Sequence, residues 1–181
     1  MRWDVKDGPR FDIAHRDESG QKVPCPVIIH ASTFGSIERS LCALIENTAV
    51  DERERCPPTL PYWLAPTQLR LIPVAARFVP WCQSLAADLR ASPVRFDVDD
   101  SEETVGRKIR AAEQDWVPYV VVAGEREASG RALSVRMRVE RETRVMDQAA
   151  LGSFLRAAQG GLPFRPLPAR VLVSANPVFH G

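Results

Sequence analysis

The sequence predicts an α/β fold in which a mixed, mostly parallel sheet is flanked by helices. Three features of the 181 residues support this prediction: strand-like and helix-like segments alternate after residue 66, residues 118–123 are apolar without interruption, and prolines are concentrated between residues 57 and 66. A continuous apolar run is typical of a strand buried on both faces. With 45% hydrophobic and 26% charged residues, the chain can form one or two small domains with real cores.

The first part of the chain, residues 1–48, predicts a few short elements. We expect a strand at residues 11–15, a turn at 18–21 and a buried strand at 27–30. A helix follows, because Ile37, Leu41, Leu44 and Ile45 recur at helical spacing and Ser36 is suited to the N-cap position. Fewer than 50 residues make a poor independent core, so this unit is expected to be a piece of a larger domain.

Residues 49–66 have the composition of a junction between domains. A charged run at residues 51–55 is followed by Pro57, Pro58, Pro61 and Pro66. From Asn47 onwards, this composition is not expected to continue a helix or a strand. The sequence therefore predicts a second domain at residues 67–181.

The second domain is predicted to follow the order βαβαββα. The expected strands cover residues 69–74, 94–98, 118–123 and 133–138, with a charged turn at 124–130. The first expected helix begins at Pro80. The second begins at a capping box formed by Asp100 and Glu103 and extends to Trp116. The third begins at Met146 and is stopped by Gly160 and Gly161. This order gives a mixed sheet flanked by helices.

Composition limits the possible partners and compartments. The net charge is only +1, so any basic surface for a nucleic acid must be local. No apolar run approaches the roughly 18 to 20 residues of a membrane helix, so we expect a cytoplasmic protein with no membrane partner. Cys25, Cys42, Cys56 and Cys82 are widely spaced, which favours mostly buried thiols over a zinc knuckle or a disulfide framework.

The segment Gly35–Arg39 is a candidate for binding an anion. It follows the apolar strand at residues 27–30, and it places Arg39 near the free backbone N–H groups at the start of the predicted helix. From these five residues alone, a surface arginine on an ordinary amphipathic helix is the simpler alternative.

Residues 27–46 resemble the third signature motif of class II aminoacyl-tRNA synthetases, in the form found in threonyl-tRNA synthetases. The resemblance implies that residues 1–48 end an antiparallel-sheet catalytic domain, with the catalytic Arg39 against ATP and Ser36 near the adenylate. It also implies that His30 is one of three protein ligands of a zinc ion. The other two ligands of the family lie further upstream, so this zinc site is incomplete; a site made with Cys25 and His15 would be a new arrangement.

The second domain resembles the anticodon-binding domain shared by the threonyl, prolyl, histidyl and glycyl synthetases. The similar segments are residues 62–74, 99–110, 117–124, 127 and 134–136, and the tail at 164–181 is similar to the archaeal threonyl form. The resemblance implies that Arg110, Glu127 and Arg136 read the anticodon, since unpaired bases can be read by hydrogen bonds and stacking. Trp116 either stacks on a base or packs in the core. Arg107 and Lys108 are expected on a solvated face, where either can touch phosphate.

These resemblances imply the C-terminal portion of an archaeal-type threonyl-tRNA synthetase. The intact enzyme, expected to be a homodimer, would use ATP with Mg²⁺ and a Zn²⁺ ion to join threonine to tRNA(Thr). Motifs 1 and 2 of the class are not visible in the 181 residues, so this chain alone is expected to be inactive and to hold no cofactor stably. The alternatives are a non-catalytic paralogue or accessory tRNA-binding module, and a structural fragment without RNA affinity.

Overall fold

The computed structural model of the chain describes residues 2–25, 27–32, 35–53, 57–90, 92–130 and 132–177, with the backbone alone at residues 51–53. The chain forms two compact units, residues 1–45 and residues 46–181. The helix α2 (Ile37–Arg53) runs across the boundary between them. Cys56 and the end of the tail, residues 178–181, lie outside the described residues.

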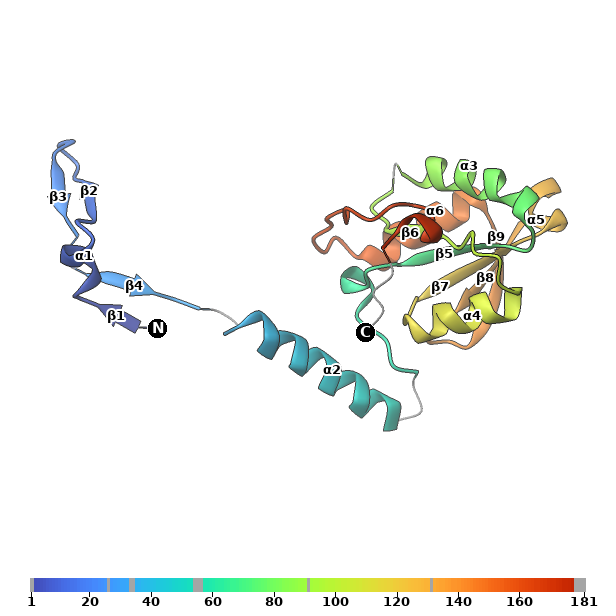
Figure 1. Cartoon of the computed structure of the whole chain (residues 1–181), viewed down its shortest axis with the longest axis horizontal. Coiled ribbons are helices and arrows are strands. Elements are labelled where there is room, and N and C mark those ends of the chain that lie inside the picture. Colours follow the sequence, from blue (N-terminus) through green and yellow to red (C-terminus); the bar gives the residue numbers. More distant parts are fainter. Residues whose placement is uncertain are drawn as a thin grey trace. The chain divides into compact units, whose positions relative to one another are not determined.

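The N-terminal unit consists of two short antiparallel ladders and one helical turn (Figure 1). Its elements are β1 (Arg2–Asp4), α1 (Asp7–Arg10), β2 (Ala14–Arg16), β3 (Lys22–Pro24) and β4 (Ile28–His30). Strand β1 pairs with β4, and β2 pairs with β3. The turn expected at residues 18–21 is confirmed, and the Asp17 carboxylate accepts hydrogen bonds there from the amides of Ser19 and Gln21.

The strand predicted at residues 11–15 is wrong in its first half. Phe11 instead ends α1, and the backbone turns at Asp12, which has a φ of 48°. The amide of Ile13 then donates to the carbonyl of Gly8, so the extended conformation begins only at Ala14. The apolar pattern at Phe11 and Ile13 indicated a strand, but it belongs to this turn.

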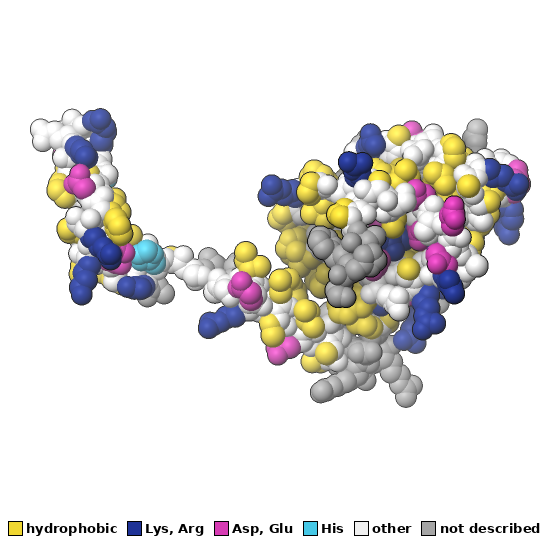
Figure 2. All heavy atoms as spheres, viewed as in Figure 1, with side chains coloured by type: hydrophobic (Ala, Val, Ile, Leu, Met, Phe, Trp, Pro, Cys, Tyr) yellow, Lys and Arg dark blue, Asp and Glu magenta, His cyan; other side chains and the backbone are white. Residues whose placement is uncertain are grey.

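The N-terminal unit buries few of its apolar side chains. Trp3 is 68% exposed and Ile29 is 52% exposed, although both belong to the β1–β4 ladder. Along α2, Ile37, Leu41 and Ile45 are exposed as well, and Figure 2 shows apolar side chains on the surfaces of this unit and of α2. This exposure agrees with the expectation that fewer than 50 residues provide a poor core.

Helix α2 is longer than the sequence predicted. It begins after Ser36, whose Oγ accepts a hydrogen bond from the Arg39 amide at 3.4 Å, as an N-cap does. It passes Asn47 and continues to Arg53, whereas the composition from Asn47 onwards was expected to exclude a helix. The charged residues are compatible with a helix, and only the prolines from Pro57 onwards are not.

The second unit contains the predicted α/β fold with a mixed sheet of five strands. Its strands are β5 (Leu69–Pro73), β6 (Phe96–Val98), β7 (Tyr119–Ala123), β8 (Ala132–Met137) and β9 (Glu142–Asp147). Their spatial order is β6-β5-β7-β8-β9. The first three strands are parallel, while β8 and β9 are each antiparallel to their neighbour.

Helices cover both faces of this sheet (Figure 1). They are α3 (Val79–Leu89), α4 (Val105–Gln114), α5 (Glu125–Ser129) and α6 (Gln148–Gln159), with short 3₁₀ turns at Tyr62–Leu64, Ala76–Phe78 and Val173–Ala175. Leu71 and Val121 face a large core with α3 and α6, whereas Ile72 and Val120 face a smaller core with α4. The alternation places successive residues of β5 and β7 in opposite layers.

Two parts of the predicted element order are wrong. Strand β9 was not predicted, because residues 142–147 are mostly exposed at this edge of the sheet and mix charged with apolar side chains. The last helix therefore begins at Gln148 rather than Met146, capped by the Asp147 carboxylate. The segment expected to be a charged turn at 124–130 contains the one-turn helix α5. Gly160 ends α6 with a φ of 59°, as predicted.

Helix α4 has a different cap and a different end from those expected. Its N-cap is Thr104, whose hydroxyl accepts from the Arg107 amide. Asp100, the predicted cap, instead accepts hydrogen bonds from the amide and the hydroxyl of Ser174. The helix ends at Gln114, so Trp116 lies beyond it, in a turn where its φ is 56°.

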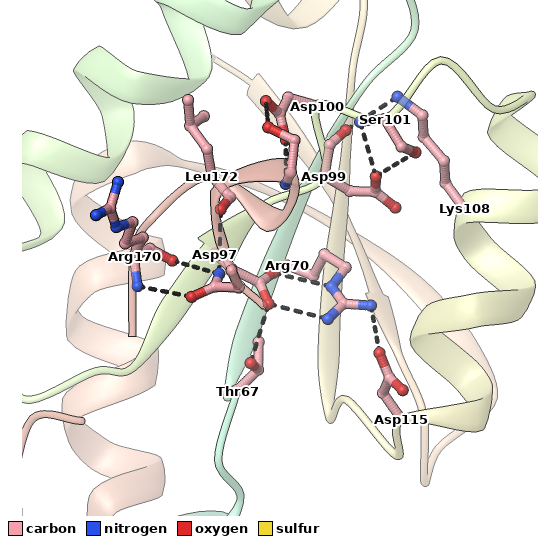
Figure 3. A network of polar contacts seen from close by, with 12 residues as sticks. Thr67, Arg70, Asp97, Asp99, Asp100, Ser101, Lys108, Asp115, Arg170 and Leu172 are labelled. Atoms are coloured by element: carbon pink, nitrogen blue, oxygen red, sulfur yellow. Dashed lines mark hydrogen bonds and ion pairs between the residues drawn. The ribbon is translucent and has the colours of Figure 1, made fainter. Parts of the chain in front are cut away.

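A buried ion-pair network joins β5, β6 and the end of α4 (Figure 3). Two guanidinium nitrogens of Arg70 donate to both oxygens of Asp97 at 2.9 Å, and a third donates to Asp115 at 2.7 Å. Burial lowers the pKa of Arg70, but the two carboxylates outweigh burial, so the pKa is raised overall. The network fixes the position of α4 on the sheet.

In the part of the chain that the structure describes, no helix combines the length and the apolar character needed to cross a bilayer.

Candidate nucleic-acid interface

The face of the sheet that carries α4 is left open at β8 and β9. In the ladder, Ser134 lies opposite Val145 and Arg136 lies opposite Thr143, and directly paired residues point to the same face. Arg136 also lies opposite Val120 of β7, which packs under α4. The side chains of Ser134 and Arg136 therefore extend this face beyond the edge of α4.

Glu127 is held at the end of this open face where β7 ends. One of its carboxylate oxygens accepts from the Gly124 amide and the other accepts from the Ser134 hydroxyl, both at 3.2 Å. The carboxylate is thus fixed between the start of α5 and strand β8.

Arg136 faces α4 across the open surface. Its guanidinium lies 3.6 Å from the carboxylate of Glu113, and both side chains are about half exposed, at 48% and 57%. Arg110, which is exposed, precedes Glu113 by three residues on α4, and residues at this spacing are neighbours on a helix. The structure therefore brings Arg110, Glu127 and Arg136 to one side of the domain.

Trp116 lies at the other end of β7 from Glu127. It is half-buried in the turn that precedes β7, whereas Glu127 follows the other end of β7. The five residues of β7 separate the two side chains by roughly 15 Å at about 3.3 Å per residue. A base stacked on Trp116 is therefore not one that also contacts Glu127, and the role of Trp116 stays a prediction.

The prediction of a solvated face is correct for Arg107 and wrong for Lys108. Arg107 is exposed and pairs with Glu103 one turn earlier. Lys108 is buried, and its ammonium group donates to the carbonyl of Asp99 at 2.9 Å. The reason is the position of Lys108 on the same side of α4 as Ala112, which packs in the smaller core. Lys108 is thus a structural residue and is not available to phosphate.

A cavity of about 550 Å³ opens beside Arg136. Its walls come from the linker, α4, the start of β7, the end of β8 and the turn into β9, namely Pro57, Ile109, Glu113, Val117, Pro118, Val120, Arg136, Met137, Arg138, Arg141, Glu142 and Thr143. Ligand pockets have volumes of about 300–1,000 Å³, so the cavity can take a small planar group.

The sequence analysis did not single out Glu113, Arg138 or Arg141, which also line this cavity. The Nε of Arg138 donates to the carbonyl of Pro58 at 2.9 Å, which holds the linker against the sheet. Burial lowers the pKa of Arg138, and the Glu113 carboxylate opposes this effect. For Glu113 the sequence offered one indication, its spacing of three residues from Arg110 on the same predicted helix. The positions of Arg138 and Arg141 at the cavity depend on the fold.

The N-terminal unit carries the remaining predicted site residues. Ser36 and Arg39 are both exposed at the start of α2. The Nε2 of His30 lies 3.8 Å from the carboxylate of Asp4. Asp4 is buried, and one of its oxygens accepts from the amides of Lys6 and Asp7 at 2.9 Å, so this carboxylate has a structural task at the start of α1.

The residues present do not complete a zinc site of the expected kind. Cys25 lies with its Sγ 3.5 Å from the Nδ1 of His15, but among the described residues the one group of possible metal ligands is Asp4, Asp7 and His30. Cys25 and His15 are therefore not assembled with His30. The role of His30 as a zinc ligand therefore stays a prediction.

Comparison with known proteins agrees with this geometry. Residues 68–158, about half of the chain, match the family described as "Anticodon binding domain". The chain belongs to the anticodon-binding domain family. The matched residues run from the start of β5 to α6, so they include the five strands of the mixed sheet and the open face with Glu127 and Arg136.

Similar proteins extend the likeness to both units of this member of the anticodon-binding domain family. The chain is 44% identical to the threonine–tRNA ligase of Methanosphaerula palustris and 42% identical to that of Caldivirga maquilingensis. Both alignments cover 98% of this chain. It spans only 29% and 28% of those relatives. The RNA binding domain of threonyl-tRNA synthetase from Cryptosporidium parvum superposes with a TM-score of 0.60 at 26% identity, covering 86% of this chain and 38% of that structure.

Proposed function

We propose that this chain is the C-terminal portion of a threonine–tRNA ligase of the archaeal type, and that its second unit binds the anticodon loop of tRNA(Thr). The observation that carries the proposal is the assembly of Glu127, Arg110 and Arg136 on the open side of one sheet. These residues come from three separate elements, α5, α4 and β8.

The chemistry of this surface suits unpaired bases. Arginine forks donate to the acceptors of a guanine or to phosphate, and a fixed carboxylate accepts from base N–H groups. Threonine anticodons end in G-U, and both bases offer N–H donors. Arg136 is about half exposed, so it can reach a bound nucleotide without a rearrangement of the core.

For the intact enzyme we propose the family's reaction in the cytoplasm. ATP with Mg²⁺ and threonine form the adenylate, with Ser36 and Arg39 beside the nucleotide, and threonine is then transferred to tRNA(Thr) by a homodimer. A zinc ion, for which His30 is one ligand, would bind the threonine substrate. Motifs 1 and 2 are not visible in these 181 residues, so threonine-dependent ATP–pyrophosphate exchange by this chain alone is expected at background. Turnover well above background would contradict the proposal that this chain lacks parts of the catalytic domain.

The test of anticodon binding compares two RNA stem-loops by fluorescence anisotropy at fixed salt. One carries the anticodon arm of tRNA(Thr), and in the other the G and U are exchanged for other bases. We expect a preference of about tenfold or more for the native anticodon, from one good bidentate contact. Arg136→Ala should lose much of it.

Arg107→Ala is the matched control for this experiment. It removes an exposed arginine from the same surface helix, where Arg107 pairs with Glu103, and it should weaken both RNAs about equally because a phosphate contact carries no sequence information. If the unchanged chain binds both RNAs alike, or binds neither, anticodon recognition is wrong for this protein.

A further inference from the structure

The cavity beside Arg136 contains a carboxylate that the predicted anticodon contacts do not use. Glu113 lies on one wall of the cavity, and Arg136 lies next to it. Their closest charged atoms are 3.6 Å apart, which is longer than a hydrogen bond. Among the described residues, this is the one ion pair that Glu113 makes, and its carboxylate oxygens accept no hydrogen bond there. They are available to a ligand.

The rest of the cavity suits a flat heterocycle with polar edges. Val117 and Val120 are buried and form an apolar floor, together with the partly buried Ile109. Apolar walls can cover the two faces of a base, while the polar groups contact its edges. Arg138 is already bonded to the linker carbonyl of Pro58, which gives this side of the cavity a fixed wall.

The turn between β8 and β9 supplies a second indication. Arg141 lines the cavity with a φ of 54°, in a region that a residue with a side chain seldom adopts. Such residues are retained where the surroundings hold them, often at binding sites. Three arginines and two glutamates line the cavity, so its formal charge favours an anionic ligand such as a nucleotide.

We propose that this cavity holds one guanine of the anticodon loop and that Glu113 determines its specificity. The carboxylate accepts from the N1–H and the exocyclic amino group of guanine, while Arg136 donates to the neighbouring O6. Guanine alone among the RNA bases presents an N–H and an amino group side by side to a carboxylate. Adenine and cytosine present an unprotonated ring nitrogen on that edge, which the carboxylate repels. The inference rests on the proposed function and deepens it.

A carboxylate at an RNA-binding surface requires a specific reason. Negative charge lowers the affinity for every RNA, because the phosphate backbone dominates the electrostatics. A half-exposed ion pair also contributes little to stability, so folding does not explain the position of Glu113. Selection of a base that can donate to the carboxylate accounts for both facts.

The experiment replaces the guanine of the threonine anticodon by inosine, which lacks the exocyclic amino group and keeps N1–H and O6. Binding of both stem-loops is measured by fluorescence anisotropy at fixed salt. The unchanged chain is expected to prefer guanine by about tenfold, and Glu113→Ala should reduce this ratio to about twofold or less. The variant should lose more affinity for the guanine RNA than for the inosine RNA, because inosine offers Glu113 only its N1–H.

Glu103→Ala is the matched control, since it removes the same charge from an exposed ion pair with Arg107 near the start of the same helix. It should keep the full preference for guanine. Glu113→Gln preserves the shape of the side chain and should lose the preference as Glu113→Ala does, with an unchanged circular dichroism spectrum.

The outcomes separate this inference from the proposed function. If Glu113→Ala keeps the guanine preference, or if the unchanged chain binds guanine and inosine RNAs alike while still preferring the native anticodon, Glu113 does not read guanine and anticodon binding stands. If the unchanged chain binds no stem-loop, both the inference and the proposed function are wrong.

Discussion

Replacing Asp97 with Asn tests whether the buried ion pairs of Arg70 hold the second unit together. The side chains of Arg70 and Asp97 are only 8% and 12% exposed, and the substitution leaves the guanidinium with Asp115 as its one charged partner. Removing one partner of a buried pair costs about 3–5 kcal/mol. Because the bond of 2.7 Å to Asp115 remains, we expect the lower end, about 3 kcal/mol.

The assay is thermal or urea unfolding followed by circular dichroism. For a domain of this size, about 3 kcal/mol corresponds to a fall in Tm of roughly 10–15 °C. Glu103→Ala is the control, because it breaks an exposed pair worth at most about 1 kcal/mol. The combined Arg70→Met and Asp97→Leu change should be less damaging than Asp97→Asn, since no buried charge is then unpaired. A loss for Asp97→Asn no larger than that for Glu103→Ala would refute the reasoning.

Three further predictions concern the tail, the thiols and the metal. Burial acts to raise the pKa of Asp100, but hydrogen bonds from Ser174 outweigh it and hold the pKa below the usual value. The tether should therefore persist above about pH 4 and be lost below it, seen as a smaller protection of the Ser174 amide relative to its intrinsic exchange rate. Asp100→Asn should remove this pH dependence. Burial raises the pKa of Cys82 to about 12. A thiol reagent at about pH 8 should therefore label the exposed Cys42 and spare Cys82 until the protein unfolds. Peptide mass spectrometry measures which of the two is labelled. Protein purified without tags should hold zinc well below one equivalent by metal analysis, because the described residues group His30 only with Asp4 and Asp7, and Asp4 already accepts two backbone hydrogen bonds. Stoichiometric zinc that disappears in His30→Ala would contradict this.

The sequence determined the elements whose signals are local. The apolar run at residues 118–123 predicted β7, and the structure places it between two strands and under helices on both faces. The Ser36 cap and the stop at Gly160 were readable because capping and a positive φ involve only neighbouring residues. The same holds for the assignment of Arg110, Glu127 and Arg136 as candidates, which rests on motifs along the chain.

The tertiary structure decided what depends on partners distant in sequence. Asp100 has the sequence context of a helix cap, yet its oxygens are taken by Ser174, 74 residues away. Lys108 has the context of a surface lysine, yet the packing of α4 on the sheet buries it. Glu113 and Arg136 come together only because β8 pairs with β7 beneath α4. Periodicity and capping signals reach about one helical turn along the chain, whereas strand order and burial are set by packing across the whole domain.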